Sequence, residues 1–587
     1  MTNDVAGSSP LPKWQLALVV GAPVALGLGY IYYRNKNSSS SSSSTDKPSR
    51  GKIKGNTTAT KENRLPEQIS GDSDFDGECL PIKPQTPLQI AQTHKNTGNV
   101  QFKARNYEGA LYHYNKAIEI CPKENANELA TFYQNRAATY EQLKIYDAVK
   151  FDCTKALELN PKYAKALLRR GRVLEQMGEL EAALDDVTTA CIFEAFSNQT
   201  TLSVADKILQ QLGKKHAQEN LANKKFIMPS KHVIKNFMTS FPNDPITLKL
   251  KDPKDTPQFL KELLQVVKDE KYDDVIPLCT KIIESPEFSE LPSSKTEVLL
   301  LRATFYLLLG KQHASMQDIE TILNNEDVSK NVKVSALIKR ATLHMQLDNP
   351  EMAFNDFNLA LNAYPTCGDI YHHRGQINLL VNKLEDAKKD FTEAMYFNPQ
   401  FGVSHVQKCY TDYRLAILNR EVELAEQALK DYMKIFDKFP DLPECYMLYA
   451  EMMTETEQFD KADTYFAKAI EKDPDNAIIY VHRALLQLQW TGNIELVVKY
   501  INKALELDEK CELAYESLGS LEVQSGNLER GIMLFEKALE YCRTTMELTH
   551  VYSLRDAAKT QLNIKNRLGD SIRDLFQAPA SGFMPLS

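Results

Sequence analysis

Five polar residues stand at spacings that could build one binding site: Lys95, Asn99, Asn135, Lys165 and Arg169. Lys95 and Asn99 are four residues apart, as are Lys165 and Arg169, and this spacing puts two side chains on one face of a helix. The basic groups supply positive charge and the asparagines supply amide donors, a combination suited to two neighbouring carboxylates. The predicted chemistry is therefore the binding of two carboxylates that lie close together, as they do at the C-terminus of a peptide that ends in Asp.

The helices that must position these residues come from a repeat. A 34-residue pattern of small, aromatic and proline residues begins at Ala91, and it returns twice before residue 197. Farther along, Ala360 and Ala394 keep the spacing of 34, as do Pro365 and Pro399. Small residues let two antiparallel helices approach closely, and proline ends the second helix. This pattern resembles the tetratricopeptide repeat, so we expect an all-α superhelix of about eleven repeats.

The period divides the repeats into two arrays. Three repeats span residues 91–197, and eight weaker ones begin near 256, 296, 334, 368, 409, 443, 478 and 512. Between the arrays, Ser203–Asn220 has helical apolar spacing and predicts a cap, while the proline-rich Met228–Thr256 predicts a connection. We expect three repeats with their cap at 86–220, a connector at 221–255, the second array at 256–565 and a tail at 566–587.

The first 85 residues predict a membrane anchor on a long tether. Trp14–Tyr33 is 20 residues without a charge, enough to cross a bilayer as a helix, with aromatic residues near both ends. A cleaved signal peptide is the alternative, but a basic n-region and a small-x-small cleavage site are missing. Residues 34–64 hold eight Lys or Arg and two Asp or Glu, which predicts a cytosolic location. We expect a leader at 1–13, a single-pass anchor at 14–33 and a disordered basic, serine-rich linker at 34–85.

Composition excludes several other functions. The chain of 587 residues has a net charge of -8, which does not suggest a nucleic-acid partner. Its ten cysteines form no CxxC pair, and Cys153 and Cys191 fall in helical patterns typical of small buried residues. His372 and His373 are adjacent, so on a helix they point about 100° apart and lack a third metal ligand. We therefore expect no metal, no cofactor and no catalytic domain.

The five polar residues match, position for position, the carboxylate clamp of chaperone-binding tetratricopeptide domains. Any one of them could be an ordinary solvated side chain, but five in register are difficult to explain in that way. The resemblance implies that the ligand is the Glu-Glu-Val-Asp tail of the cytosolic 70- and 90-kDa heat-shock chaperones.

The layout of the whole chain resembles the family of 70-kDa receptors in the mitochondrial outer-membrane translocase. This resemblance covers roughly residues 14–565 and includes His373-Arg374-Gly375-Gln376; the serine run and a leader with one basic residue depart from it. It implies an import receptor on the mitochondrial outer membrane, with its repeats in the cytosol. Its expected partners are chaperones, mitochondrial precursor proteins and other translocase subunits. The alternatives are a chaperone-docking scaffold on another cytosol-facing membrane, such as the endoplasmic reticulum, and a repeat-bearing glycosyl-transferring enzyme, whose α/β domain is missing.

The clamp also predicts which residues of the second array face its groove, because it occupies fixed positions of each first helix. The same positions in the repeats that begin at 296, 334, 368, 409 and 443 form an apolar and aromatic surface suited to hydrophobic precursor segments. They are Leu300, Leu301, Ile338, Thr342, His372, His373, Gln376, Tyr410, Tyr413, Met447 and Leu448. Packing of some of them against a neighbouring helix is the alternative.

Overall fold

In a computed structural model of the chain, residues 85–254, 256–285 and 292–569 are described. Within these ranges the backbone forms α-helices, one short 3-10 helix and no strand, which confirms the all-α prediction. The expected anchor at 14–33 and its flanks lie outside the described residues. Of the helices that are described, none is long and apolar enough to span a membrane.

Each repeat consists of two successive helices with one left-handed residue at the joint between them, and within each compact unit the two helices are antiparallel. Such a residue ends the first helix and turns the chain back toward the second. The described chain has eleven joints of this kind, in agreement with the expected number of repeats: Arg105, Lys144, Gly178, Glu270, Gly310, Asp348, Asn382, Arg420, Glu457, Gly492 and Gly526.

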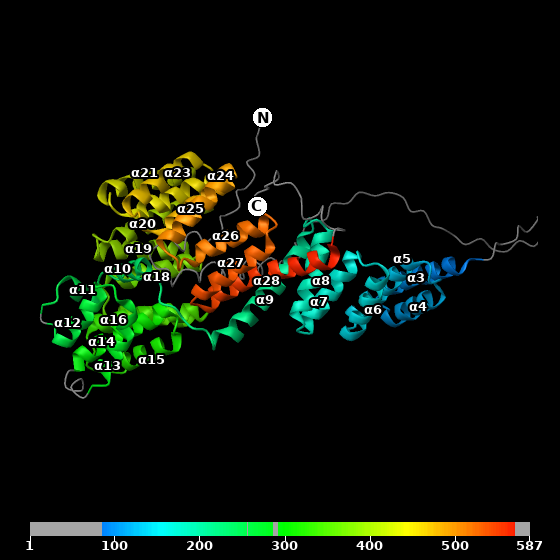
Figure 1. Cartoon of the computed structure of the whole chain (residues 1–587), viewed down its shortest axis with the longest axis horizontal. Coiled ribbons are helices and arrows are strands. Elements are labelled where there is room, and N and C mark those ends of the chain that lie inside the picture. The colour runs from blue at the N-terminus through cyan, green and yellow to red at the C-terminus, as the bar shows by residue number, and fades with distance from the viewer. Residues whose placement is uncertain (1–84, 255, 286–291, 570–587) are drawn as a thin grey trace, which may run out of the picture. The chain divides into compact units, whose positions relative to one another are not determined.

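The chain separates into two compact units, one ending at Gly178 and the other beginning at Glu179. The first unit holds α3 (Pro87–Lys103), α4 (Tyr107–Ile120), α5 (Ala126–Gln142), α6 (Tyr146–Leu159) and α7 (Ala164–Gln176), which stack as antiparallel neighbours (Figure 1). A Cβ atom on Gly98 would approach the Tyr114 ring to 2.7 Å, so the close crossing of α3 and α4 requires glycine. The unit boundary falls inside the third repeat, between its two helices.

The second unit begins with α8 (Leu180–Phe193) and α9 (Gln199–Leu221), and α9 includes the helix expected at Ser203–Asn220. The expected connector contains two short helices, α10 (Lys231–Thr239) and α11 (Pro245–Lys251). The second array follows: α12 (Gln258–Lys268), η1 (Tyr272–Asp274), α13 (Val275–Ile283), α14 (Pro292–Leu309), α15 (Gln312–Leu323), α16 (Lys330–Gln346), α17 (Pro350–Ala363), α18 (Gly368–Leu380), α19 (Leu384–Phe397), α20 (Gly402–Asn419), α21 (Val422–Lys438), α22 (Pro443–Glu455), α23 (Phe459–Lys472), α24 (Ala477–Thr491), α25 (Ile494–Leu507), α26 (Glu512–Gln524), α27 (Leu528–Tyr541) and α28 (Thr545–Leu568).

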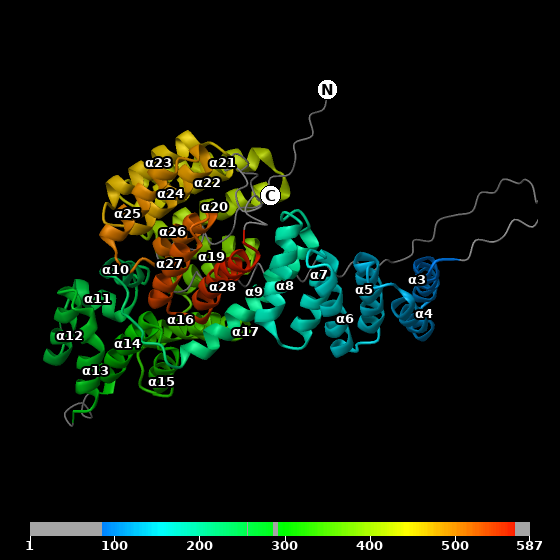
Figure 2. The same cartoon turned by 45° about the vertical axis from the view of Figure 1, so that its right-hand side comes forward.

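One repeat of the second array is longer than its neighbours. Its first helix begins at Gly402, 34 residues after Gly368, whereas we expected it near residue 409. Helix α20 has 18 residues and α21 has 17, against 13 for α18 and α22 and 14 for α19 and α23. The pair is therefore extended by about one turn in each helix (Figure 2). The expected start was wrong because the seven extra residues lie inside this repeat, between Gly402 and Pro443, and not before it.

Buried ion pairs connect the two helices of several repeats. An Arg on the first helix donates two hydrogen bonds to an Asp on the second in Arg136–Asp152, Arg302–Asp318 and Arg340–Asp356. Each pair is separated by 16 residues, and the Asp side chains are at most 7% exposed. This planar geometry fixes how the two helices of a repeat pack.

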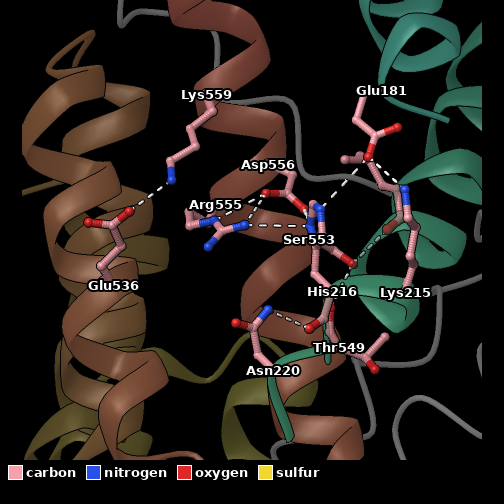
Figure 3. A network of polar contacts seen from close by, with 11 residues as sticks. Glu181, Lys215, His216, Asn220, Glu536, Thr549, Ser553, Arg555, Asp556 and Lys559 are labelled. Atoms are coloured by element: carbon pink, nitrogen blue, oxygen red, sulfur yellow. Dashed lines mark hydrogen bonds and ion pairs between the residues drawn. The ribbon is translucent and has the colours of Figure 1, made fainter. Parts of the chain in front are cut away.

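The last described helix closes the second unit against its beginning. His216 of α9 lies 2.7 Å from Asp556 of α28, and Ser553 donates a hydrogen bond of 3.0 Å to the Leu209 carbonyl (Figure 3). In the same network Lys215 pairs with Glu181 at 2.9 Å. A Cβ on Gly213 would come within 2.5 Å of the Thr549 carbonyl oxygen, so the two helices touch backbone to backbone there.

Candidate functional site

The clamp residues come from the first helix of each of the first three repeats. Lys95 and Asn99 lie on α3, Asn135 lies on α5, and Lys165 and Arg169 lie on α7. All five belong to the first unit, in which α5 contacts both α3 and α7. The repeat therefore places the five residues on three first helices, of which α5 contacts the other two, as the sequence predicted.

Hydrogen bonds orient the two asparagines. The Asn99 side-chain oxygen accepts hydrogen bonds from the Tyr114 hydroxyl at 2.7 Å and from the Asn135 amide nitrogen at 3.2 Å. Because this oxygen is occupied by two donors, the Asn99 NH₂ group is left to donate. The pair therefore presents amide donors, which suits a carboxylate ligand.

The three basic residues differ in how they are held. Arg169 donates from Nε to Glu141 at 2.7 Å and from a terminal nitrogen to the Gln134 carbonyl at 3.4 Å. Lys95 and Lys165 have no ion-pair or hydrogen-bond partner within the described ranges, and Lys165 is exposed. An acidic tail would supply carboxylates to both lysines. Within the described ranges, the three basic clamp residues thus comprise one cation that is held by an ion pair and two that have no such partner.

Two residues that support the clamp were not found from the sequence. Tyr114 fixes Asn99, and Glu141 holds Arg169 in place while balancing its charge. Both lie on different helices from the residues that they contact, at separations of 15 and 28 residues. Tyr114 is one of the aromatic residues of the repeat pattern, which suggested a packing role. Nothing in the sequence pattern indicated a role for Glu141.

The predicted groove residues of the second array are all buried. None of the eleven is more than 6% exposed: Leu300, Leu301, Ile338, Thr342, His372, His373, Gln376, Tyr410, Tyr413, Met447 and Leu448. The expectation of an open apolar surface therefore differs from this structure, in which neighbouring side chains cover these positions. Their contact with a precursor stays a prediction, and it requires the face to open.

The connector covers part of this face. Phe241, between α10 and α11, stacks on the His373 ring at 4.1 Å, and the Lys339 ammonium lies 4.3 Å from the Phe241 ring centre. Asp244 pairs with Lys339 at 2.6 Å, and Asn243 donates two hydrogen bonds to Asp369. The segment expected to be only a connection is thus packed into the inner side of α16 and α18.

Farther along the array, the chain's own helices cover the face. Tyr410, Tyr413, Met447 and Leu448 belong to one apolar cluster built by α20 to α24. The groove positions of this repeat change when they are counted from Gly402, the first residue of α20, and not from residue 409. Tyr410 then still occupies a groove position, and Gln407 occupies one in place of Tyr413. Replacing either tyrosine by Ser would remove packed core atoms, so a loss of precursor binding in such variants would not by itself identify a contact.

The adjacent histidines are core residues. His372 donates to or accepts from the Ser404 hydroxyl at 2.9 Å, and His373 pairs with the Gln376 side chain at 3.1 Å. Burial lowers the pKa of both rings, and the nearby Lys339 charge helps to lower that of His373 to about 3. Both rings are therefore neutral at pH 7. No group of three or more His, Cys, Asp or Glu side chains suited to a metal occurs among the described residues.

This burial predicts an acid sensitivity that depends on His373. Its pKa is about 3 in the folded chain and about 6.5 when unfolded, so the stability that it contributes is complete above pH 6.5 and is lost as the pH falls. Between pH 7.5 and 5.5 the wild type should lose about 1.4 kcal/mol more than His373→Gln. Urea unfolding at the two pH values measures this difference. Buried carboxyls such as Asp369 are present in both the wild type and the variant, so their effect cancels in the comparison. Equal losses of unfolding free energy in the two proteins would contradict the prediction.

The cysteines that the structure describes are all buried thiols. Cys153 and Cys191 are 0% and 2% exposed, which confirms that they pack as small apolar residues. Burial raises the pKa of Cys153 to about 12 and that of Cys191 to about 11, so neither is a reactive thiolate at pH 7.

Comparison with known proteins gives consistent matches. Family profiles for the tetratricopeptide repeat match residues 91–124, 130–163 and 153–185. The "Mitochondrial import receptor subunit TOM70" of Rattus norvegicus is 38% identical over 579 residues, covering 96% of this chain and 94% of the relative. The "Hsp70/Hsp90 co-chaperone CNS1" of Saccharomyces cerevisiae is 31% identical over 191 residues, covering 29% of this chain and 47% of that protein. The crystal structure of yeast Tom70 aligns with a TM-score of 0.47 and 24% identity over 83% of this chain and 99% of the yeast chain.

Proposed function

Because the chain belongs to the family of mitochondrial import receptor subunits called TOM70, we propose that it receives precursor proteins from cytosolic chaperones at the mitochondrial outer membrane. The observation that carries this proposal is the set of clamp residues on α3, α5 and α7, with two oriented asparagines and two lysines that have no ion-pair partner within the described ranges. Family membership favours the mitochondrial function over a scaffold on the endoplasmic reticulum.

The clamp binds the acidic C-terminal tail of the chaperone. Lys95 and Lys165 pair with carboxylates of the terminal Asp, and the asparagines donate to the same groups. Arg169 contributes a planar group already held by Glu141, so it loses little freedom when the tail binds. The 70- and 90-kDa heat-shock chaperones, whose tails end in Glu-Glu-Val-Asp, have this chemistry.

The rest of the chain anchors the clamp at the membrane and binds the client, which is the precursor protein that the chaperone delivers. A single anchor at 14–33 holds the protein in the outer membrane, with the linker and both arrays in the cytosol. The role is that of a receptor and not of an enzyme: the chaperone supplies the energy, and the client passes to the translocation pore.

The client binds the inner face of the second array. Four buried polar atoms on this face have no hydrogen-bond partner among the described residues: His372 Nε2, His373 Nε2, Gln376 Nε2 and Gln407 Oε1. Unpaired buried polar groups are costly, so a segment that enters between the helices gains by pairing with them. Apolar neighbours such as Ile338 and Met447 suit hydrophobic precursor segments.

The clamp is tested by Arg169→Ala. A hydrogen bond to a charged group contributes about 1.5–3 kcal/mol, and partial exposure of the site reduces this value. Loss of the guanidinium also leaves Glu141 unpaired beside the ligand. Binding of a peptide ending in Glu-Glu-Val-Asp should weaken by about tenfold or more, as measured by calorimetry or fluorescence anisotropy.

The matched control is Arg170→Ala. Arg170 is on the same helix but donates to Thr154 on α6, at 3.0 Å, and so points away from the clamp. A peptide with an amidated C-terminus controls for the terminal carboxylate. Equal affinity of Arg169→Ala and wild type, at unchanged helix content, would exclude the assignment.

A further inference from the structure

The extended repeat formed by α20 and α21 ends in an apolar tip. Four large apolar side chains lie within eight residues of its joint and are 50–70% exposed: Ile417, Leu418, Val422 and Leu424. Other joints of the described chain expose fewer, for example Leu347 and Met352, or Trp490 and Ile494. Scattered exposed apolar residues are normal, but a group at a protruding tip is typical of an interaction site.

Charged residues surround this tip. Glu421, Glu423 and Glu426 are exposed, and Arg420 is the one basic residue beside them. None of these four has an ion-pair partner within the described ranges. Carboxylates in a first helical turn favour helix formation, which explains Glu423, but the helix dipole does not explain four apolar side chains in solvent. The tip therefore combines four exposed apolar side chains with three exposed carboxylates, which we call its acidic edge.

The tip lies at the far end of α20 from the inner positions that are proposed to bind the client. The inner positions of α20 end at Tyr410, which is buried, and Ile417 follows about two turns later. The clamp belongs to the other unit. A partner could therefore occupy the tip while a client is bound at the inner face of the second array.

We propose that the tip of α20 and α21 binds a basic amphipathic cytosolic segment of another membrane-anchored translocase subunit. Such subunits carry an excess of Lys and Arg in the cytosolic flanks of their spans, which complements the acidic edge, and the apolar face of such a segment covers the four side chains. An acidic edge disfavours the anionic surface of a membrane. This inference rests on the proposed anchoring, since the tether keeps the tip and the partner at one surface and raises their effective concentration.

The experiment uses the full chain in mitochondria, with a photoreactive benzoylphenylalanine in place of Leu418. Illumination without a precursor in transit should give an adduct with the Lys- and Arg-rich cytosolic segment of one translocase subunit, identified by mass spectrometry. Glu421→Lys combined with Glu426→Lys should lower its yield by about fivefold or more, and higher ionic strength should lower it as well. The same probe at Met533, which is 70% exposed on α27, should give no such adduct.

A second probe separates this inference from the proposed function. Benzoylphenylalanine in place of Lys162, an exposed residue just before α7, should capture a chaperone at the clamp. Failure of this probe would count against the proposed function. If it succeeds while the Leu418 probe captures lipid, a precursor, a second copy of this chain or nothing, the docking proposal is wrong. Circular dichroism of the charge variant excludes a folding defect as the cause of a lower yield.

Discussion

Lys339→Met should lower the free energy of unfolding of the second unit by about 3–5 kcal/mol. The Lys339 and Asp244 side chains are only 2% and 6% exposed, and their ion pair is 2.6 Å long. Asp244 also accepts hydrogen bonds from the Ser335 hydroxyl and from the Ile246 amide that begins α11. Removal of the ammonium leaves a buried carboxylate without its counter-charge, which costs more than the pair itself contributes.

Urea unfolding of the purified chain measures this effect, with two controls. Asp244→Asn added to Lys339→Met removes the stranded charge and keeps a residue that can cap α11, so the double variant should be more stable than the single one. Lys434 forms a surface pair with Asp431 and is 75% exposed, and its replacement by Met should change stability by at most about 0.5 kcal/mol. A change below about 1 kcal/mol in Lys339→Met would show that the pair does not hold the connector.

A chain that stops at Arg543 should lose the folded second unit and keep the clamp. Helix α28 buries Leu548, Val551, Tyr552, Ala558 and Ile564. Burial of one large apolar side chain contributes about 1.5–3 kcal/mol, so removal of this helix costs most of the 5–15 kcal/mol that stabilises a typical domain. The exposed partner surfaces on α9 and α27 would also promote aggregation.

Limited proteolysis and binding of the Glu-Glu-Val-Asp peptide separate the two units in this experiment. The region after Glu179 should be cleaved rapidly, while the fragment that contains the five clamp residues should persist and bind the peptide. The control chain ends at Gly569 and retains all of α28. A truncated chain that unfolds with the cooperativity of the control would contradict the prediction.

The fold and the placement of the five clamp residues on three first helices could be predicted, because both depend on local spacing. Thirty-four-residue periodicity specifies helix pairs, and a spacing of four specifies one face of a helix, so Lys95 and Asn99 needed no tertiary information. Glu141 could not be predicted in this way, because its contact with Arg169 depends on how α5 packs on α7. The sequence shows which residues share a helix face, but not which side chains meet across two helices.

The second array was less predictable for two physical reasons. The start of α20 was misplaced by seven residues, because an added turn in each helix leaves every local signal intact while it shifts the period. The burial of the predicted groove residues could not be predicted either, because it depends on which other segments of the chain pack against them. Phe241 covers His373 from a segment that proline made look like a linker, although Pro245 in fact begins α11.

The contact between α9 and α28 also fixes the order in which the protein becomes complete during synthesis. His216 and Asp556 are separated by 340 residues, so α9 leaves the ribosome long before its partner helix exists. The first unit, in contrast, is built from contacts between neighbouring repeats and can fold as soon as α7 has emerged. A nascent chain therefore displays a working clamp beside an unfinished second unit with exposed apolar surface. For that interval the chaperones whose tails fit this clamp are in place to protect the receptor itself.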